Sequence, residues 1–334
     1  MLIKHSASRG VITLIVYIDD IIVTGNDPME MQLLKDQLAM EFEIKELGKL
    51  KCFLGIEVAW SKEGIFVSQQ KHVLDLFKEF GMLGCKPIDT LIEPNHKLGE
   101  ASDDTPMDWG RYQRLVGKLI YLLHTRPDIA YVVSVIRQFM HNPKDVHFQV
   151  AYRVLRYLKS TPGKGILFKK GAELSLEAYI DANSVGSVVD RRLTLGHCTL
   201  LGGNLVTWRS KKQIVVAKSS VEAEFKAMAH DIFELLWLKI ILDDLKIKWK
   251  GLMKLYCDKK SAINIAHNLV QHDWTKHVEV DRHFIKEKLE SGLICTPYVP
   301  THAQLTNILT KGLANSSFQE VTSKLGMDNI YSPT

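Results

Sequence analysis

Hydrophobic and polar positions near the start of the chain alternate as in strands and then change to helical spacing. In residues 11–25, two β-branched runs flank Asp19 and Asp20, and a Gly-Asn-Asp-Pro sequence follows. This pattern predicts a β-hairpin with acidic residues at its tip. In residues 29–44 apolar residues recur at helical spacing, and Pro28 suits the first turn of a helix. We therefore predict a helix directly after the hairpin.

The remainder of the first region combines a second hairpin with a helical block. The pattern predicts a hairpin from the runs 50–60 and 64–69, a helix ended by Gly81, and a connector at 84–110. Apolar residues at helical spacing then predict helices throughout 111–160, the last ended by Thr-Pro-Gly. This block is expected to be mainly α-helical.

From Leu174 onward the pattern changes to strands and helices in the order β-β-β-α-β-α-β-α, which is typical of a mixed sheet with covering helices. The runs lie at 174–181, 194–210, 213–219, 221–245, 253–268, 281–292, 293–300 and 305–313. The expected fold class is therefore α/β (α+β). The boundary is placed near Gly171, giving domains 1–170 and 171–334. At about 150 residues per domain, 334 residues correspond to a little over two domains.

Charge changes this picture only locally. The formal net charge is +5, too small to indicate a nucleic-acid partner by itself. The stretch 153–170 nevertheless has six Lys or Arg residues and no acid, and Arg209, Lys211 and Lys212 form a second cluster. An ordinary solvated face would explain either cluster alone.

Cysteine usage and hydropathy restrict the compartment. The five cysteines are odd in number and include no Cys-x-x-Cys pair, which argues against a disulfide framework and favours a reducing compartment. The most apolar stretches, 11–23 and 235–242, are short and carry charge, so no membrane span is predicted. The N-terminus lacks the apolar core of a signal peptide. We expect an intracellular protein, cytoplasmic or nuclear and not secreted.

Acidic residues of the second region stand where strands end or the long helix begins. Asp181 and Asp258 each end a predicted strand, and Glu224 lies in the first turns of the helix. Carboxylates that converge from adjacent strand ends and one helix suit a pair of divalent cations, which activate water and stabilise the leaving oxygen in phosphodiester hydrolysis. For any single acid, a cap or a solvated carboxylate is the simpler interpretation. The combination is what indicates a metal site, and Asp281 is a further candidate.

Seven segments, taken in order, closely resemble one known family. They are YIDD preceded by LIV, FLGIEV, RLVGKLIYLLHTRPDIAYVVSVI, RYLKSTPGKGI, SSVEAEFKA, YCDKKSAI and KHVEVDRHFIKEKL. Together they resemble the C-terminal part of a copia-type LTR retrotransposon Pol polyprotein over nearly the whole chain. The resemblance implies a truncated reverse-transcriptase palm and thumb, followed by a ribonuclease H-like mixed five-stranded sheet with covering helices.

The resemblance makes the first region the C-terminal part of reverse transcriptase. Asp19 and Asp20 would be metal ligands at the palm turn, and Phe53 and Gly55 would belong to the primer-grip segment. Three basic residues of the thumb or connection would lie along a nucleic-acid backbone: Arg153, Arg156 and Lys159. The implied partners are an RNA template and a DNA primer.

The resemblance makes the second region a ribonuclease H domain, which cleaves the RNA strand of RNA/DNA hybrids. Its ligands for Mg²⁺ or Mn²⁺ would be Asp181, Glu224 rather than Glu222, and Asp258. His302 matches a loop histidine near the leaving group and would assist product departure. Simple solvent exposure is the alternative interpretation of His302.

Three departures from the family pattern affect this expectation. A polymerase palm needs a further carboxylate well before the YIDD hairpin, and the chain starts sixteen residues before that motif, so the polymerase part is expected to be incomplete and inactive. Asn307 occupies the position at which the family carries its fourth ribonuclease H carboxylate, and a neutral amide is a poorer metal ligand than a carboxylate. Lys259 places a positive charge directly after Asp258. His277 and Asp281 belong to a family signature, and Asp281 either replaces the missing ligand or caps its helix. The alternative function is a decayed element copy that retains only nucleic-acid binding.

Overall fold

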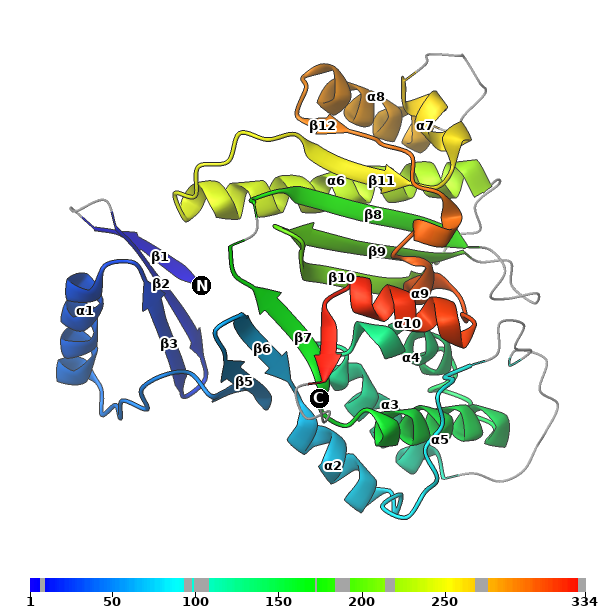
Figure 1. The fold of residues 1–334 in the computed structure, drawn as a ribbon, viewed down its shortest axis with the longest axis horizontal. Helices are drawn as coiled ribbons and strands as arrows, with labels where there is room; N and C mark the ends of the chain where they lie inside the picture. Colours follow the sequence, from blue (N-terminus) through cyan, green and yellow to red (C-terminus); the bar gives the residue numbers. More distant parts are fainter. Residues whose placement is uncertain are drawn as a thin grey trace.

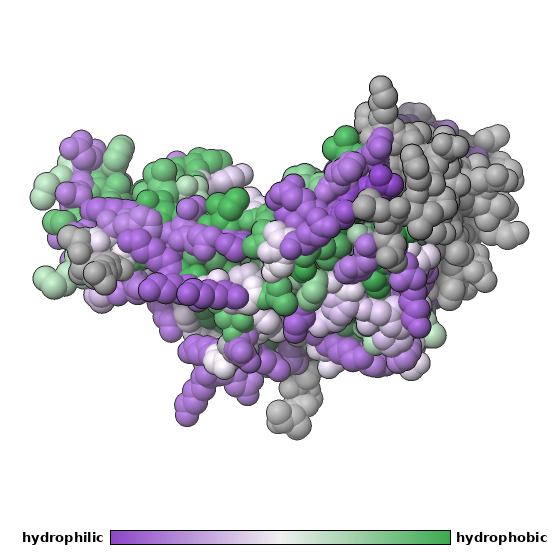
Figure 2. All heavy atoms as spheres, turned by 90° about the horizontal axis from the view of Figure 1, so that it is seen from above, coloured by the Kyte–Doolittle hydropathy of each residue, from purple (hydrophilic) through white to green (hydrophobic). Residues whose placement is uncertain are grey.

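The computed structural model describes residues 1–6, 10–92, 98, 108–171, 173–183, 193–213, 220–267 and 276–329, with the backbone alone described at 183, 220–223 and 276–278. Within these residues the strands form three sheets, one of three strands and two of five. The small sheet lies at one end of the molecule, and helices surround the other two (Figure 1). Seen from above, the molecule is hollowed between its two ends (Figure 2). The predicted mixed α/β class is confirmed.

The small sheet contains the predicted acidic hairpin. Strands β1 (Leu2–His5), β2 (Val11–Tyr17) and β3 (Asp20–Gly25) are antiparallel, and α1 (Pro28–Glu41) follows. The Asp27 side chain caps α1 by accepting a 3.2 Å hydrogen bond from the Glu30 amide, and proline occupies the first turn. Both the hairpin and the helix are confirmed because turn and capping residues specify them locally.

The second sheet corrects the prediction for residues 50–60. This run is a tight hairpin, because Leu54 and Gly55 turn at positive φ of 50° and 71°. The sheet order is β13-β7-β6-β5-β4. Its strands are β4 (Cys52–Phe53), β5 (Ile56–Trp60), β6 (Gly64–Ser68), β7 (Lys164–Lys169) and β13 (Met327–Asn329). The sequence pattern did not predict β7 or β13.

The helical block is confirmed, and an ion pair lies inside it. Its elements are α2 (Gln70–Glu79), α3 (Trp109–Leu122), the 3-10 helix η2 (Pro127–Ile129), α4 (Ala130–Arg137) and α5 (Asp145–Ser160). Arg126 contacts Asp128 at 2.7 Å, and the Tyr157 hydroxyl donates a 2.6 Å hydrogen bond to the same carboxylate. Arg126 also donates to the carbonyl of Thr161, the residue after α5, at 2.8 Å. The buried ion pair is therefore fully hydrogen-bonded and ties η2 to the end of α5.

The third sheet has the predicted mixed character. Its order is β10-β9-β8-β11-β12, with β9 antiparallel to both of its neighbours and β11 parallel to both of its own. The strands are β8 (Leu176–Asn183), β9 (Thr194–Leu201), β10 (Asn204–Lys212), β11 (Met253–Cys257) and β12 (Ile294–Cys295). The helices are α6 (Ser220–Asp244), α7 (Lys260–His267), α8 (Lys276–Glu290), the 3-10 helix η3 (Thr301–Ala303), α9 (Asn307–Thr310) and α10 (Asn315–Lys324). The predicted run 194–210 is a hairpin of two strands, and most of the predicted strand 213–219 lies outside the described residues.

The end of the described chain returns to the first region. Strand β13 pairs with β7, and Phe318 and Val321 of α10 belong to the same buried core as the helical block. A boundary near Gly171 therefore stays a prediction. No described helix is long and apolar enough to span a membrane. All five cysteines are free.

Candidate metal centre

The carboxylates predicted from strand ends lie together. Asp181 is on β8, Asp258 directly follows β11, and Glu224 is in the first turns of α6. Because β8 and β11 are parallel neighbours, their carboxyl ends meet at one edge of the sheet. One oxygen of each carboxylate lies within 4.8 Å of the others, and all three residues are buried. The geometry brings together the acids that the sequence selected.

Helix α9 closes over Asp181 because a glycine leaves room for it. Gly196 pairs with Asp181 across β8 and β9, and a Cβ at Gly196 would lie only 2.5 Å from Cγ2 of Thr310. The Thr310 hydroxyl donates a hydrogen bond to Oδ2 of Asp181. Gln304, just before α9, donates a 2.7 Å hydrogen bond to the Ile180 carbonyl. These contacts fix the first carboxylate against the sheet.

The other two carboxylates are each held by one oxygen. The Ala182 amide donates a 3.1 Å hydrogen bond to Oε1 of Glu224, and the Thr301 hydroxyl donates a 2.9 Å hydrogen bond to Oδ2 of Asp258. Oε2 of Glu224 and Oδ1 of Asp258 are buried without a hydrogen-bond partner. Buried anionic oxygens without donors suit a hard divalent cation. The donor set therefore fits Mg²⁺ or Mn²⁺.

The electrostatics also favour an added cation. Burial, with a further contribution from Asp181, raises the pKa of Glu224 to about 8. Burial also raises the pKa of Asp181, and Asp258 adds to this shift, while the Thr310 hydrogen bond opposes it. Three close carboxylates cannot all ionise cheaply, and a divalent ion would relieve their repulsion.

The departure at Lys259 has a structural consequence. Its Nζ lies 3.7 Å from Oδ1 of Asp258, one of the two unpartnered oxygens. Partial burial lowers the pKa of Lys259, but the surrounding carboxylates, with Asp258 contributing most, raise this pKa overall. Lys259 is therefore charged and supplies part of the positive charge that a metal ion would otherwise bring.

Asn307 is connected to the carboxylate cluster through Thr301. Its side chain is buried at the start of α9, and Nδ2 donates a 2.5 Å hydrogen bond to the carbonyl of Thr301, whose hydroxyl holds Asp258. Oδ1 of Asn307 is buried without a partner. His302, the next residue after Thr301, is solvent-exposed on η3. The amide therefore stands beside the centre, at the position where the resemblance expects a carboxylate.

The two proposed roles of Asp281 do not match its position. It lies inside α8, five residues after Lys276, so it does not cap that helix. It is also not part of the carboxylate cluster formed by described residues. The side chain of His277 lies outside the described residues.

Relatives of the chain identify its family. Residues 1–94 match the reverse transcriptase (RNA-dependent DNA polymerase) family. The retrovirus-related Pol polyprotein from transposon RE1 of Arabidopsis thaliana is 39% identical over 322 residues, covering 96% of this chain and 22% of that protein. A Saccharomyces cerevisiae protein of transposon Ty5-1 is 35% identical over 235 residues, covering 69% of this chain and 76% of that protein. The chain belongs to the copia-type retrotransposon Pol family.

A solved structure agrees with this family at the level of the fold. The foamy viral protease-reverse transcriptase in complex with RNA/DNA hybrid superposes with a TM-score of 0.50 at 13% identity, covering 86% of this chain and 36% of that one. The present chain spans 22% of the RE1 polyprotein. What a whole Pol polyprotein does is therefore a proposal for this chain.

The turn predicted to be the palm motif is solvent-exposed. Asp19 lies in the turn of the β2–β3 hairpin, and Asp20 begins β3. Ile18 between Tyr17 and Asp19 has a positive φ of 50° and is 79% exposed. Within the described part of the chain, neither acid belongs to a group of three possible metal ligands. Their metal-binding role stays a prediction.

The predicted primer-grip turn packs on the helical block. The Tyr121 hydroxyl of α3 donates a hydrogen bond to the Leu54 carbonyl, between Phe53 and Gly55. Burial raises the pKa of Tyr121, and the charge of nearby Tyr17 adds to this shift. The Tyr121 hydrogen bond thus fixes the turn at Leu54 against α3. Contact of Phe53 and Gly55 with nucleic acid remains a prediction.

The basic residues predicted on α5 make contacts within the chain. Arg153 donates to the Thr90 carbonyl at 3.1 Å, and Lys159 donates to the Leu83 carbonyl at 3.0 Å. Arg156 likewise donates to the Lys86 carbonyl at 3.1 Å. All three hold residues 83–90, at the start of the connector, against α5. Their predicted role along a nucleic-acid backbone remains untested and competes with these contacts.

The second basic cluster lines a groove. A groove of about 830 Å³ runs between α4 and β10, and its lining includes Arg137, Arg209, Lys211 and Lys212. Arg137, Arg209 and Lys211 are exposed, whereas Lys212 donates a 2.8 Å hydrogen bond to Gln138. This groove offers cations to a phosphate backbone. The charge pattern of the sequence indicated the cluster on β10 but not its neighbour Arg137 on α4.

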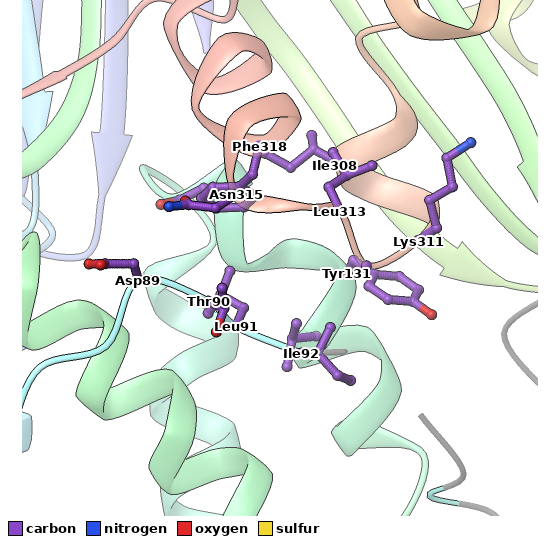
Figure 3. A pocket seen from close by; sticks show the side chains of 13 residues that line it. Asp89, Thr90, Leu91, Ile92, Tyr131, Ile308, Lys311, Leu313, Asn315 and Phe318 are labelled. Carbon is purple, nitrogen blue, oxygen red and sulfur yellow. The ribbon is translucent and has the colours of Figure 1, made fainter. Parts of the chain in front are cut away.

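A smaller cavity has a different character. Its volume is about 20 Å³, and residues 89–92 of the connector line one side while Ile308, Asn315 and Phe318 line the other (Figure 3). This volume suffices for about one water molecule. The cavity is therefore a packing junction and too small for a substrate.

Proposed function

We propose that this chain hydrolyses the RNA strand of RNA/DNA hybrids at the centre formed by Asp181, Glu224 and Asp258. The observation that carries the proposal is the convergence of these buried carboxylates from β8, α6 and the end of β11 within 4.8 Å. The unpartnered oxygens of Glu224 and Asp258 support it. The centre is the position at which a scissile phosphate would be cleaved.

The carboxylates would hold two divalent ions, Mg²⁺ or Mn²⁺. When bound, such ions activate a water and stabilise the leaving oxygen. Thr301 and Thr310 keep two of the carboxylates in fixed orientations by hydrogen bonds to one oxygen each. His302 is exposed beside Thr301, and we assign it delivery of a proton to the leaving oxygen.

The groove between α4 and β10 would carry the nucleic acid. Its exposed cations, Arg137, Arg209 and Lys211, fit a sequence-independent contact with phosphates. The expected ligand of this groove is an RNA/DNA hybrid, the kind of duplex that reverse transcription produces. We do not assign DNA synthesis to this chain, because among the described residues no third acid joins Asp19 and Asp20.

A second candidate function is hybrid binding without cleavage. Two residues favour it because each weakens the attraction of the centre for a second cation. Lys259 places a positive charge 3.7 Å from Oδ1 of Asp258, and Asn307 offers a neutral amide in place of a carboxylate. The two functions differ in one property. Binding alone requires no divalent ion, whereas cleavage does.

Cleavage of hybrids labelled on either strand decides between these functions. With Mg²⁺ or Mn²⁺ present, we expect RNA products only, no cutting of double-stranded DNA, and no products in EDTA. Glu224→Gln should abolish the products, whereas Asp243→Asn, an exposed acid on the same helix, should not. Retention of hybrid binding without any RNA product under these conditions would support the second candidate and refute the first.

A further inference from the structure

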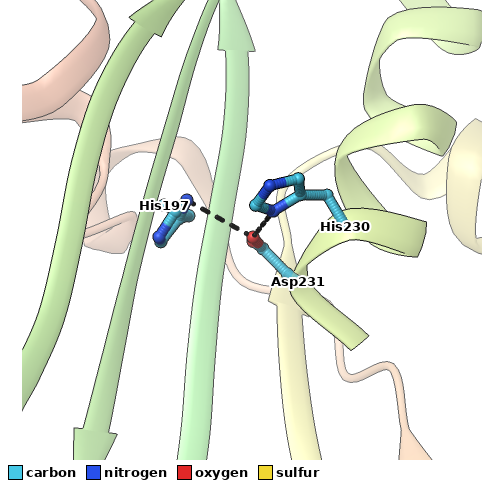
Figure 4. A group of neighbouring side chains, drawn as sticks. All are labelled: His197, His230 and Asp231. Atoms are coloured by element: carbon cyan, nitrogen blue, oxygen red, sulfur yellow. Dashed lines mark ion pairs between the residues drawn. The ribbon is translucent and has the colours of Figure 1, made fainter. Parts of the chain in front are cut away.

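A second cluster of possible metal ligands lies apart from the carboxylate centre. It consists of His197 on β9 and of His230 and Asp231 on α6 (Figure 4). One ligand atom of each lies within 4.8 Å of the others. Asp231 is seven residues after Glu224 on α6, which is about 10 Å along a helix. The two clusters are therefore separate.

Asp231 is a buried acid without a hydrogen bond. It is 1% exposed, and neither carboxylate oxygen has a hydrogen-bond partner. Its nearest cationic candidates are Nδ1 of His197 at 3.5 Å and Nδ1 of His230 at 3.7 Å, both longer than a hydrogen bond. Burial raises the pKa of Asp231 to about 7, although the neighbouring His230 opposes this shift. A buried carboxylate in this state is short of positive charge.

The distances match ligands arranged around one small cation. Two ligand atoms bound to a tetrahedral zinc ion, each about 2.1 Å from it, lie about 3.4 Å apart. The separations of 3.5 and 3.7 Å from Oδ1 of Asp231 are close to this value. Two imidazole nitrogens and one carboxylate form a donor set of the borderline class, which prefers Zn²⁺ to Mg²⁺.

We propose that His197, His230 and Asp231 bind a Zn²⁺ ion, or a transition-metal ion of the same class, with a fourth position open to solvent. The half-exposed ring of His230 gives the ion access, and the buried His197 and Asp231 fix the site to the sheet and the helix. The bound ion would join β9 to α6. Arg209, which pairs with His197 across β9 and β10, opposes the ion by its charge, and Glu234 on α6 partly offsets that charge.

Zn²⁺ binding to the full chain in excess Mg²⁺ tests the proposal, because Mg²⁺ occupies oxygen sites and leaves nitrogen sites to Zn²⁺. Calorimetry should give one Zn²⁺ per chain. His230→Ala should weaken binding by more than about 100-fold, since loss of an outer-sphere partner alone costs about 10–100-fold. The exposed His283→Ala on α8 is the matched control and should bind as the parent does. Zn²⁺ should also raise the melting temperature of the parent and not that of His230→Ala.

Two results would overturn the assignment. One is the absence of Zn²⁺ binding in excess Mg²⁺, which would leave the cluster as an ion pair between Asp231 and a protonated histidine. The other is parent-like binding by His230→Ala combined with loss in Glu224→Gln, which would place the ion at the carboxylate centre. Because His230 is half-exposed, His230→Ala is expected to fold, and circular dichroism checks that it does.

Discussion

The hydroxyl of Thr301 donates a 2.9 Å hydrogen bond to Oδ2 of Asp258, and the other oxygen of this carboxylate is buried without a hydrogen-bond partner. Thr301 is thus a positioning residue for a metal ligand. Loss of such a partner commonly weakens metal binding by about 10–100-fold.

Thr301→Ala should therefore raise the Mg²⁺ concentration for half-maximal hybrid cleavage by about 10-fold, at the lower end of that range because Thr301 is exposed to solvent. Thr301→Ser keeps the hydroxyl and should behave as the parent does. The measurement is the cleavage rate as a function of Mg²⁺. Equal Mg²⁺ requirements for Thr301→Ala and Thr301→Ser would show that the hydroxyl does not orient Asp258.

Asn307→Asp should restore an anionic ligand beside the centre. In the parent, Nδ2 of Asn307 donates to the Thr301 carbonyl, and a carboxylate cannot make this bond. The variant should therefore be less stable without metal, by about 1–3 kcal/mol, and should cleave hybrids at lower Mg²⁺ than the parent. Urea unfolding in EDTA and an Mg²⁺ titration of cleavage measure the two effects. If the parent cleaves hybrids well and Asn307→Asp has the same metal dependence as the parent, Asn307 is not at the site.

The stability of the metal-free chain should fall as pH rises. The folded pKa of Glu224 is about 8, above its ordinary value of 4.5, so its protonated form favours folding. This contribution is complete below about pH 4.5 and is lost as pH rises through about 8. The raised pKa of Asp181 acts in the same direction. At about 1.4 kcal/mol per pKa unit, the loss is on the order of a few kcal/mol.

Urea unfolding across this pH range, with EDTA or with Mg²⁺, measures that loss. Mg²⁺ should reduce the slope because it stabilises the ionised carboxylates. Glu224→Gln should make the slope in EDTA clearly shallower, and the part that remains is expected from Asp181 and Asp231, whose pKa values are also raised. A slope that is the same in Glu224→Gln as in the parent would remove Glu224 as its source.

Hybrid binding should depend on the groove between α4 and β10. Arg137→Ala combined with Lys211→Ala should reduce the magnitude of the salt slope of binding by about 2, since each lost phosphate contact changes it by about 1. Lys78→Ala, an exposed lysine on α2, is the control and should leave the slope unchanged. Filter binding at several salt concentrations gives the slopes. If the double variant kept the parent slope, the groove would be an ordinary solvated surface.

Local signals account for what the sequence predicted well. The β2–β3 hairpin and α1 follow from turn and capping residues next to each other in the chain. The carboxylate centre followed from acids at two strand ends and a helix start, because the ends of parallel strands meet at one sheet edge. The segment containing Thr301 and Thr310 matched the family, yet nothing in it showed which hydroxyl would meet which acid.

Long-range contacts account for the features that the sequence did not predict. Strand β7 is short, and its partner β13 lies more than 150 residues away in the chain. The acceptors of the basic residues on α5 are backbone carbonyls of a connector that precedes them by about seventy positions, as with Arg156 and Lys86. A pattern of charges in sequence cannot distinguish a cation that binds phosphate from one that holds a loop.

Hybrid cleavage by the parent and by Asp181→Asn in Mg²⁺ tests the central claim most directly. Asp181 lies on β8 in hydrogen-bond contact with Thr310, and its carboxylate is one of the three that converge. The claim predicts Mg²⁺-dependent RNA products from the parent and none from Asp181→Asn, with hybrid binding retained by both. RNA products that appear equally with Asp181→Asn, or that persist in EDTA, would contradict it.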